Sequence, residues 1–365
     1  MQPSPVVDGV ELCAPLPGRN LPPRAFTSRA VFELEQRAIF ARSWVHVADT
    51  SDLAAPGSYV AAQIGATPVL VVRDRDGALR GYLNACRHRG AQLLEGKGTC
   101  AAQIKCPYHA WSYALDGKLH GVPYRDDFAH CDLSTTSLVP VRLGTVGPLV
   151  FACLDQAAPP LAEWVGELPA SLARAGVERW QLAWEASYEL DANWKLFVEN
   201  ANDGYHVPFV HDILTDAIVI DPATSQTVLE PHSAYSWARL NPNYVPPDMD
   251  PAIARVRFGS IFPNLIPVLS PSDFTYLRID PIGHDRLKLF ARSYDDPALP
   301  DLPAIREFRR IAFQRTTEQD LAVVLRTQRG LQAIGLPAGV HASQLEQRIG
   351  HFERTWSAAM ASYST

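Results

Sequence analysis

The 365-residue chain has no long hydrophobic run, few cysteines and no excess of basic residues. Its longest apolar run, residues 146–154, is about half the length of a membrane-spanning helix, which needs about 20 residues. Lys and Arg number 33 against 39 Asp and Glu, so the net charge is −6. This balance does not favour binding to nucleic acid or to an anionic membrane, and neither partner is expected.

Six cysteines in 365 residues are too few for a fold held together by disulfides. The first residues, MQPSPVVDGVELC, lack the basic segment and apolar core of a signal peptide. We therefore expect a cytoplasmic protein, in which cysteines stay reduced and are free to bind metal. A Gly-x-Gly-x-x-Gly motif after a strand is also absent, so the chain is not expected to hold its own nicotinamide or flavin.

The order of sequence patterns predicts a small β domain inserted into an α+β domain. Strand-like text fills residues 58–154 and returns at 225–295, and two hairpins are predicted at Asp76-Gly77 and Asp116-Gly117. The helical patterns are 26–44, 161–176, 193–206 and 303–334. We place an N-terminal helical segment at 1–43, the β domain at 44–156 and the larger domain at 157–365.

Two mixed pairs of metal ligands occur in 86-CRHRGAQLLEGKGTCAAQIKCPYH-109. Cys86 stands with His88 and Cys106 with His109, and seventeen residues separate His88 from Cys106. Structural zinc sites usually present Cys-x₂₋₄-Cys pairs instead. Mixed pairs on two loops fit a Rieske [2Fe–2S] centre, in which two Cys hold one iron and two His hold the other. A zinc ribbon is the alternative.

The motifs CRHRG and CPYHAWSYALDGKL resemble the Rieske domain of the aromatic-ring-hydroxylating oxygenases, α (terminal oxygenase) subunit. Respiratory Rieske proteins carry an additional Cys in each loop, and CRHRGA and CPYHAW have none. The resemblance therefore favours the oxygenase branch. Cys100, between the two loops, has no assigned role.

A second motif, 193-NWKLFVENANDGYHVPFVH-211, contains two histidines and several polar neighbours. Asp203 and His206 would share a helix face, and Pro208 prevents a regular helix from continuing to His211. Two His and one carboxylate form the facial triad of non-haem Fe(II) oxygenases. Spacing alone would also suit two ordinary histidines, but the full pattern, with FPNL at 262–265, resembles the iron site of the same family.

The third iron ligand is implied by the resemblance. In the family it is a carboxylate on a long helix near the C-terminus, which matches 318-EQDLAVVLRTQRGL-331 and points to Asp320. A carboxylate on an apolar helix face is costly unless it is paired or bound to metal. Glu318 and Asp320 both have apolar neighbours at helical spacing, so periodicity alone does not choose between them.

The resemblance also implies how electrons pass between the centres. The family places a residue like Asp203 between an iron-ligand His of its own chain and a cluster-ligand His of the next. Carried over, Asp203 would join His206 to His109 of a neighbouring subunit in a homotrimer. Asn200 is expected near the iron without firm ligation, and Glu199 is expected to support the bridge. The alternative is an ordinary Asp–His pair on a helix surface.

The function that the resemblance implies is that of a terminal oxygenase with a Rieske [2Fe–2S] cluster and a mononuclear Fe(II). A separate NAD(P)H-dependent reductase, directly or through a ferredoxin, would supply electrons for hydroxylation or dihydroxylation by O₂. The implied α+β fold is a Rieske all-β domain inserted in a catalytic domain with an antiparallel sheet wrapped by helices. An electron carrier without oxygenase activity and a zinc-stabilised interaction module remain alternatives.

Apolar residues between 205 and 276 are candidates for the substrate pocket. They are Val210, Leu214, Phe258, Ile261, Phe274 and Tyr276. Such side chains suit a flat aromatic ring, which is the expected substrate. They could equally enclose a quaternary ammonium through cation–π contacts, so demethylation of a quaternary ammonium or methylamine compound is the alternative.

Overall fold

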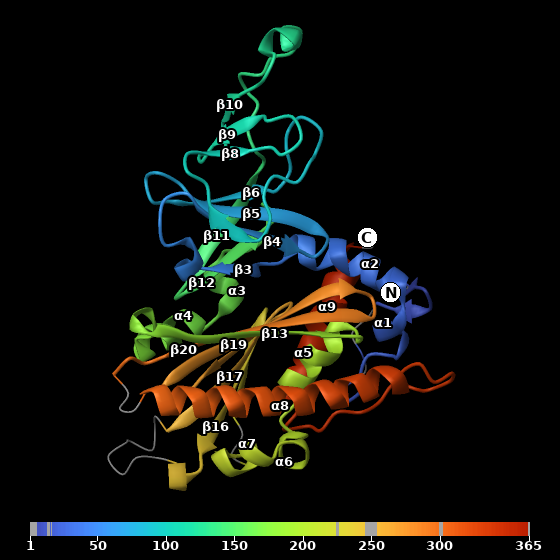
Figure 1. Ribbon diagram of the computed structural model, residues 1–365. Coiled ribbons are helices and arrows are strands. Elements are labelled where there is room, and N and C mark those ends of the chain that lie inside the picture. Colours follow the sequence, from blue (N-terminus) through green and yellow to red (C-terminus); the bar gives the residue numbers. More distant parts are fainter. Residues whose placement is uncertain are drawn as a thin grey trace. The chain divides into compact units, whose positions relative to one another are not determined.

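The computed structural model describes residues 6–12, 15, 17–223, 226–244, 254–298 and 302–363. Two compact units share the chain: Phe40–Leu161 form one, and Met1–Ile39 with Ala162–Thr365 form the other (Figure 1). The smaller unit thus interrupts the sequence of the larger one, which agrees with the fold expected from the sequence. None of the helices in the described part of the chain has the length and hydrophobicity of a membrane-spanning segment.

The smaller unit consists of antiparallel strands in two sheets. The seven-stranded sheet has the order β3-β12-β11-β6-β5-β4-β7, and the three-stranded sheet has the order β10-β9-β8. Their bounds are β3 Val45–Asp49, β4 Ser58–Ile64, β5 Thr67–Arg73, β6 Leu79–Leu83, β7 Lys97–Thr99, β8 Gln103–Lys105, β9 Ser112–Ala114, β10 Leu119–Gly121, β11 Pro140–Val146 and β12 Leu149–Cys153.

Both predicted hairpins are confirmed, as β5–β6 and β9–β10. Each turns at a glycine in the left-handed region, Gly77 at φ 84° and Gly117 at φ 87°. A side chain is disfavoured in that backbone conformation, which explains the Asp-Gly pair in each turn.

The larger unit is built on an eight-stranded antiparallel sheet in the order β13-β20-β19-β18-β17-β16-β14, with β15 also paired to β16. The strands are β13 Gln181–Leu190, β14 Ile218–Val219, β15 Gln226–Leu229, β16 Ser233–Leu240, β17 Arg255–Ile261, β18 Leu265–Leu269, β19 Asp273–Gly283 and β20 Arg286–Asp295. The strand-like region expected at 225–295 is thereby confirmed, and β19 and β20 form its longest hairpin.

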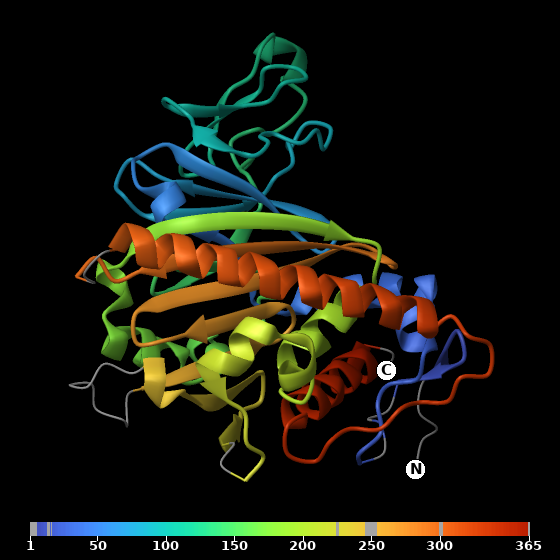
Figure 2. The ribbon, with the colours of Figure 1, turned by 60° about the horizontal axis from the view of Figure 1, so that its bottom comes forward.

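Helices pack against this sheet, and the one that runs along it in Figure 2 is the longest among the described residues. This helix, α8, spans Leu302–Gly330, and the others are α1 Arg24–Thr27, α2 Arg29–Ala38, α3 Leu161–Val165, α4 Leu168–Ala175, α5 Trp194–Asn202, α6 Val207–Val210, α7 Asp212–Ala217 and α9 Gln347–Tyr363. The helical patterns predicted near 26–44, 161–176, 193–206 and 303–334 correspond to α2, α3 with α4, α5, and α8.

A fully buried ion pair fixes the start of α5 against its neighbours. Glu35 of α2 accepts hydrogen bonds from Lys195 Nζ at 2.6 Å and from the indole nitrogens of Trp194 and Trp356, both at 2.8 Å. The Glu35 and Lys195 side chains are both 0% exposed. Since a buried charge is costly without partners, this network ties α2, α5 and α9 together in one arrangement. Helix α5 is thereby held firmly, and it leads directly into the histidine motif.

Candidate metal centres

The two Cys-His loops of the smaller unit have the same backbone structure. In the first, the Cys86 N–H bonds to the Ala91 carbonyl at 2.8 Å, and the Gly90 N–H bonds to the Cys86 carbonyl at 2.8 Å. In the second, the Cys106 N–H bonds to the Trp111 carbonyl at 2.8 Å, and the Ala110 N–H bonds to the Cys106 carbonyl at 3.2 Å. The two loops therefore share one backbone hydrogen-bond pattern, in which His88 stands two residues after its cysteine and His109 three.

Both loops have a left-handed residue four positions after the cysteine, Gly90 at φ 74° and Ala110 at φ 58°. This conformation is unusual for alanine and turns the chain sharply after each ligand pair. The sequence difference between Cys-x-His and Cys-x-x-His is thus accommodated within one loop geometry.

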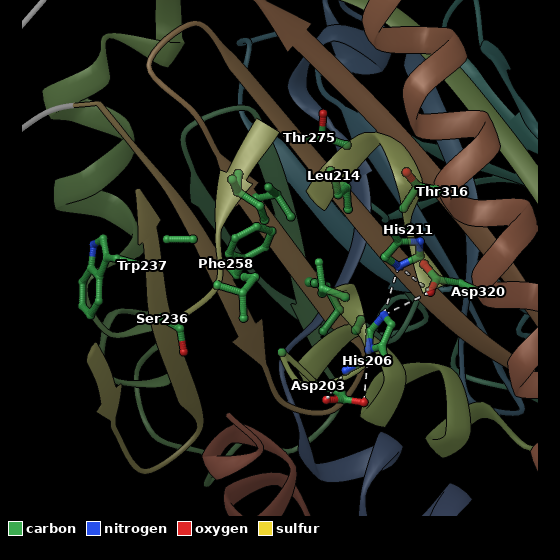
Figure 3. A pocket seen from close by; sticks show the side chains of 18 of the residues that line it. Asp203, His206, His211, Leu214, Ser236, Trp237, Phe258, Thr275, Thr316 and Asp320 are labelled. Carbon is green, nitrogen blue, oxygen red and sulfur yellow. Dashed lines mark hydrogen bonds and ion pairs between the residues drawn. The ribbon is translucent and has the colours of Figure 1, made fainter. Parts of the chain in front are cut away.

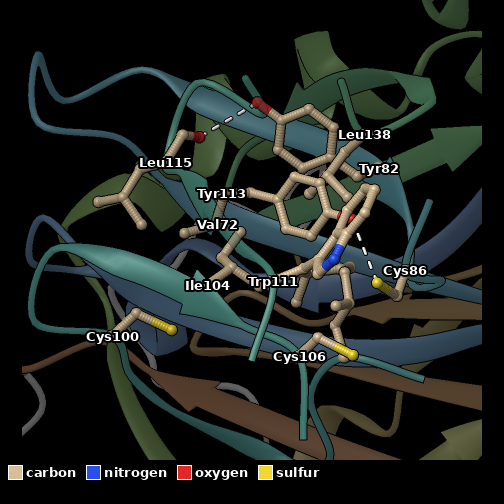
Figure 4. Close-up of a cluster of buried hydrophobic side chains, with 12 residues drawn as sticks. Val72, Tyr82, Cys86, Cys100, Ile104, Cys106, Trp111, Tyr113, Leu115 and Leu138 are labelled. Carbon is tan, nitrogen blue, oxygen red and sulfur yellow. Dashed lines mark hydrogen bonds between the residues drawn. The ribbon is translucent and has the colours of Figure 1, made fainter. Parts of the chain in front are cut away.

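The cysteines lie in the core, and the histidines are half-buried. Cys86 and Cys106 are 4% and 3% exposed within an apolar cluster that includes Trp111 and Tyr113 (Figure 4). The Tyr113 hydroxyl accepts the Arg87 N–H at 2.9 Å and lies 3.2 Å from Cys86 Sγ. Its own proton is therefore free to be donated to that sulfur, an interaction known to tune iron–sulfur sites.

The histidine rings lie against each other at the edge of this core. The His88 and His109 rings have centroids 4.7 Å apart, and Trp111 stacks on His88 at 4.9 Å. Burial lowers the pKa of His88, which favours the neutral ring that a metal requires.

The four residues of the two loops do not fit a single zinc ion. Among the described residues, only His206, His211 and Asp320 bring three ligand atoms within 4.8 Å of one another. Tetrahedral zinc would need its ligands at least as close as this, because each bond is about 2.0–2.3 Å long. The two Cys and two His lie farther apart than the ligands of a single zinc ion. This spacing suits a larger group with bridging sulfides, such as a [2Fe–2S] cluster.

The second candidate centre lies after α5 in the larger unit. Helix α5 ends at Asn202, His206 precedes the short helix α6, and His211 separates α6 from α7. Pro208 lies in the first turn of α6, where its missing N–H is tolerated. The predicted break before His211 is confirmed, and it turns the two rings toward each other.

Three side chains converge on one point at this centre (Figure 3). His206 Nε2 and His211 Nε2 are 3.0 Å apart, and Asp320 Oδ1 lies 3.4 Å from the first and 3.1 Å from the second. Metal bonds of about 2.1 Å at right angles place neighbouring ligands about 3.0 Å apart. The distances thus suit three ligands on one face of a metal ion, the facial arrangement of non-haem iron sites.

The outer nitrogen of each histidine faces an oxygen acceptor. His206 Nδ1 is 3.1 Å from Asp203 Oδ2, and His211 Nδ1 is 3.1 Å from Gln319 Oε1. With Nδ1 protonated in both rings, both Nε2 lone pairs are directed toward Asp320. Although burial lowers the pKa of His206, the Asp203 and Asp320 carboxylates raise it to about 9, so a metal bound at Nε2 would displace a proton at neutral pH.

Asn200, expected near the iron, and Glu199, expected to support the bridge, have different surroundings. Asn200 Nδ2 is 3.2 Å from Asp320 Oδ1 and 3.3 Å from His206 Nε2, so the amide lies beside the candidate metal position. Burial and then the Glu353 carboxylate raise the pKa of Glu199 well above its usual range. Within the described residues no hydrogen bond joins Glu199 to Asp203.

A cavity of about 900 Å³ opens onto the triad. One wall is a row of side chains from neighbouring strands, Ser236, Phe258, Val268 and Thr275, which lie opposite one another in register. Helix α8 supplies another wall that includes Phe313, whose ring centroid is 4.5 Å from that of Trp184. His206, His211 and Asp320 line the same space, so a molecule held there would lie against the candidate metal ligands.

The predicted pocket residues are partly corrected. Leu214 and Phe258 line the cavity, whereas Val210, Ile261, Phe274 and Tyr276 are not among the described residues that line it. Successive side chains of a strand point to opposite faces. On β19 the cavity face carries Thr275 and Leu277, so Phe274 and Tyr276 are buried on the other face, as is Ile261 of β17.

Three residues near the centres have no recognisable signal in the sequence. They are Tyr113 beside Cys86, Gln319 beside His211, and Arg348 of α9. Arg348 is 6% exposed and donates to the Ala201 carbonyl at 3.3 Å, which ties α9 to the last turn of α5. Each acts through a contact between segments distant in the chain, so spacing within a motif could not reveal it.

Comparison with known families places the chain in one class of protein. Residues 177–362 match the ring-hydroxylating α subunit (catalytic domain) family, and residues 43–138 match the Rieske [2Fe–2S] domain family. The chain belongs to the ring-hydroxylating α subunits, which are Rieske non-haem iron oxygenases with a [2Fe–2S] cluster and a mononuclear iron. The family and the cofactors expected from the sequence are thereby confirmed.

Particular relatives are identical to the chain at about a third of the aligned positions. The carnitine monooxygenase oxygenase subunit of Escherichia coli (strain K12) is 36% identical over 204 residues, which are 55% of this chain and 54% of that protein. The glycine betaine monooxygenase oxygenase subunit of Chromohalobacter salexigens is 34% identical over 202 residues, 55% of this chain and 45% of that protein. These alignments span about half the length of the curated relatives.

Solved structures match over nearly the whole chain. A quaternary ammonium Rieske monooxygenase in complex with L-carnitine aligns with a TM-score of 0.80 at 26% identity, covering 93% of this chain and 95% of that one. Naphthalene 1,2-dioxygenase from Rhodococcus sp. aligns with a TM-score of 0.76 at 23% identity, covering 94% and 95%. The second match shows the shared fold alone.

Proposed function

We propose that the chain is the terminal oxygenase of a multicomponent Rieske system and oxidises a quaternary ammonium or methylated amine compound. The observation that carries this proposal is the cavity that opens onto His206, His211 and Asp320. When bound, the mononuclear iron supplies the position at which O₂ is activated, and the Rieske cluster supplies electrons. A separate NAD(P)H-dependent reductase would deliver those electrons to the cluster, directly or through a ferredoxin.

In this mechanism, side chains of the chain bind the metals, orient the histidine ligands and shield the reacting carbon from water. Cys86, Cys106, His88 and His109 would hold the cluster, and the facial triad would hold the iron. Asp203 keeps the proton on His206 Nδ1, because its carboxylate lies 3.1 Å from that nitrogen. The Phe258 and Phe313 side chains give the cavity an apolar wall that limits water beside the reacting carbon.

The comparisons favour the quaternary ammonium alternative over the aromatic substrate expected from the sequence. The relatives at 36% and 34% identity are named for carnitine and glycine betaine, and the structure at 26% identity contains L-carnitine. The naphthalene dioxygenase structure supports only the fold. The cavity is compatible with this choice, because an aromatic face such as that of Trp184 or Phe313 attracts a quaternary ammonium.

The substrate proposal is tested with the purified oxygenase, a Rieske-type reductase and NADH. The panel contains carnitine, glycine betaine and choline, neutral tert-butyl analogues of the same shape, and naphthalene and benzoate. We expect substrate-dependent product formation with a trimethylammonium compound, and weaker binding of its neutral analogue because the cation–π attraction is lost. Product from an aromatic ring, with every ammonium compound inert, would contradict this part of the proposal.

We propose further that electrons cross between subunits, with Asp203 linking His206 to His109 of a neighbouring chain in a homotrimer. A solved relative is described as showing inter-subunit electron transfer. Exposed aromatic residues lie beside each centre, Tyr108 at 60% next to His109, and Tyr205 at 53% and Phe209 at 77% next to His206. Exposed aromatic residues of this kind suit a protein interface, here with a second copy of the chain.

Asp203→Asn is expected to slow electron transfer by orders of magnitude while leaving both centres loaded. Asparagine keeps a hydrogen-bonding oxygen near the N–H of Tyr205, but it lacks the charge that Asp203 directs at His206 Nδ1. Stopped-flow spectroscopy of the reduced protein with O₂ and substrate would follow oxidation of the cluster. An unchanged rate would show that Asp203 is not part of the route.

A mixing experiment tests whether the route runs between chains. Asp203→Asn is combined with a Cys106→Ser variant that lacks the cluster, and mixed oligomers are verified by mass spectrometry. Some interfaces then pair an intact cluster with an intact Asp203, so partial activity should return. No recovery in verified mixed oligomers would favour transfer within a single chain.

A further inference from the structure

The two candidate histidine ligands face acceptors of different charge. His206 Nδ1 faces the carboxylate of Asp203 at 3.1 Å, whereas His211 Nδ1 faces the neutral amide of Gln319 at 3.1 Å. Gln319 immediately precedes Asp320 on α8, so one helix supplies both a candidate metal ligand and the partner of another.

A chain of contacts determines which way the Gln319 amide points. Gln319 Nε2 donates to Asp212 Oδ1 at 3.4 Å, and Arg315 Nη2 donates to Asp212 Oδ2. A carboxylate only accepts hydrogen bonds, so the NH₂ group must face Asp212 and the amide oxygen must face His211. An oxygen at that position accepts a proton from His211 Nδ1, which leaves the Nε2 lone pair for a metal.

We call this series of contacts, from His211 through Gln319 and Asp212 to Arg315, the relay. Its members come from two short stretches of the sequence. Asp212 directly follows His211 at the start of α7, and Arg315 and Gln319 are one helical turn apart on α8. The relay therefore joins the two segments that carry His211 and Asp320. Arg315 and Asp212 are 57% and 50% exposed, so its outer end lies at the surface and its inner end at the cavity.

We infer that Gln319 is a positioning residue for the metal centre, held by Asp212 and Arg315. It fixes the tautomer of His211 and does so without adding a negative charge, unlike Asp203 at the other histidine. This inference rests on the proposed iron site formed by His206, His211 and Asp320. It assigns a role to three residues outside that triad.

The test measures metal binding rather than turnover. The protein keeps its Rieske cluster, its mononuclear iron is removed with a chelator, and Co(II) is titrated into the emptied site. We expect Gln319→Leu to weaken Co(II) binding about 10- to 100-fold, the usual effect of removing the partner of a metal-bound histidine. Gln319→Glu combined with Asp212→Asn should bind Co(II) at least as tightly as the wild type, because a carboxylate oxygen accepts the same proton and an amide at position 212 can donate to that carboxylate.

The matched control is Gln314→Leu on the same helix. Gln314 is exposed and bonds to Glu318 at 3.0 Å, so this variant should bind Co(II) like the wild type. Proton NMR of the Co(II) protein gives a second readout. The exchangeable ring N–H signals of both histidines should be visible in the wild type, and only that of His211 should broaden in Gln319→Leu.

Two results would overturn the inference alone: Gln319→Leu binding Co(II) like the wild type, or the Gln319→Glu variant with Asp212→Asn binding as weakly as Gln319→Leu. The second would mean that the side chain acts by packing and not as a proton acceptor. A wild-type protein that binds no Co(II) at this site would overturn the iron site itself, and the inference with it.

Discussion

Asp320→Ala should lose the mononuclear iron and all turnover while keeping the full Rieske spectrum. Asp320 Oδ1 is the only carboxylate oxygen, among the described residues, that joins His206 Nε2 and His211 Nε2 in a group able to hold a metal. Without it, two neutral imidazoles remain to hold a divalent cation, which weakens binding severely. The cluster should persist because its four ligands belong to the other compact unit.

Glu318→Ala is the matched control, since it removes a carboxylate two residues away on the same helix. Glu318 is exposed and bonds to Gln314 instead of either histidine. It should retain iron and activity. Metal analysis and electron paramagnetic resonance of the two variants give the result, and loss of iron from Glu318→Ala with retention in Asp320→Ala would reverse the assignment.

Cys106→Ser should abolish the Rieske centre altogether, with loss of the red-brown colour and of the reduced-state resonance signal. Cys106 is 3% exposed within the core and lies in one of the two equivalent loops. Serine replaces a thiolate by a hydroxyl that is a poor ligand for the cluster iron. Turnover should fall to zero, since no electrons could reach the mononuclear centre.

Cys100→Ser provides the matched control for this change. Cys100 is 8% exposed in the same apolar cluster, but the Cys100 N–H bonds to Gly57 and the residue lies outside both ligand loops. Its variant should keep the cluster spectrum with only a modest loss of stability. A Cys106→Ser protein that remained red-brown with the wild-type signal would exclude Cys106 as a ligand.

Local motifs carried most of what could be predicted about the site. Each Cys-His pair lies in one loop, and His206 and His211 lie on either side of Pro208. These residues are close in the sequence and also close in the structure, so a motif was enough to find them. The choice between Glu318 and Asp320 depends on how α8 packs, because both have apolar neighbours at helical spacing. The structure separates them: Glu318 is exposed, and Asp320 lies 3.1 Å from His211.

The cavity wall was less predictable because it depends on strand register. A shift of one residue moves every side chain of a strand to the other face. The sequence indicated strands near residue 275, but it did not show that Thr275 faces the cavity while Phe274 and Tyr276 face the core. Contacts between distant segments, such as Gln319 with His211, require the fold itself.

The presence of two metal centres is tested most directly by an iron and sulfide count per chain, made together with electron paramagnetic resonance of the reduced wild-type protein. We expect a Rieske signal with a low average g value and more iron than the two atoms held by the cluster. That additional iron should disappear in Asp320→Ala and persist in Glu318→Ala. A colourless protein with stoichiometric zinc, or iron confined to the cluster in the wild type, would contradict the presence of two centres.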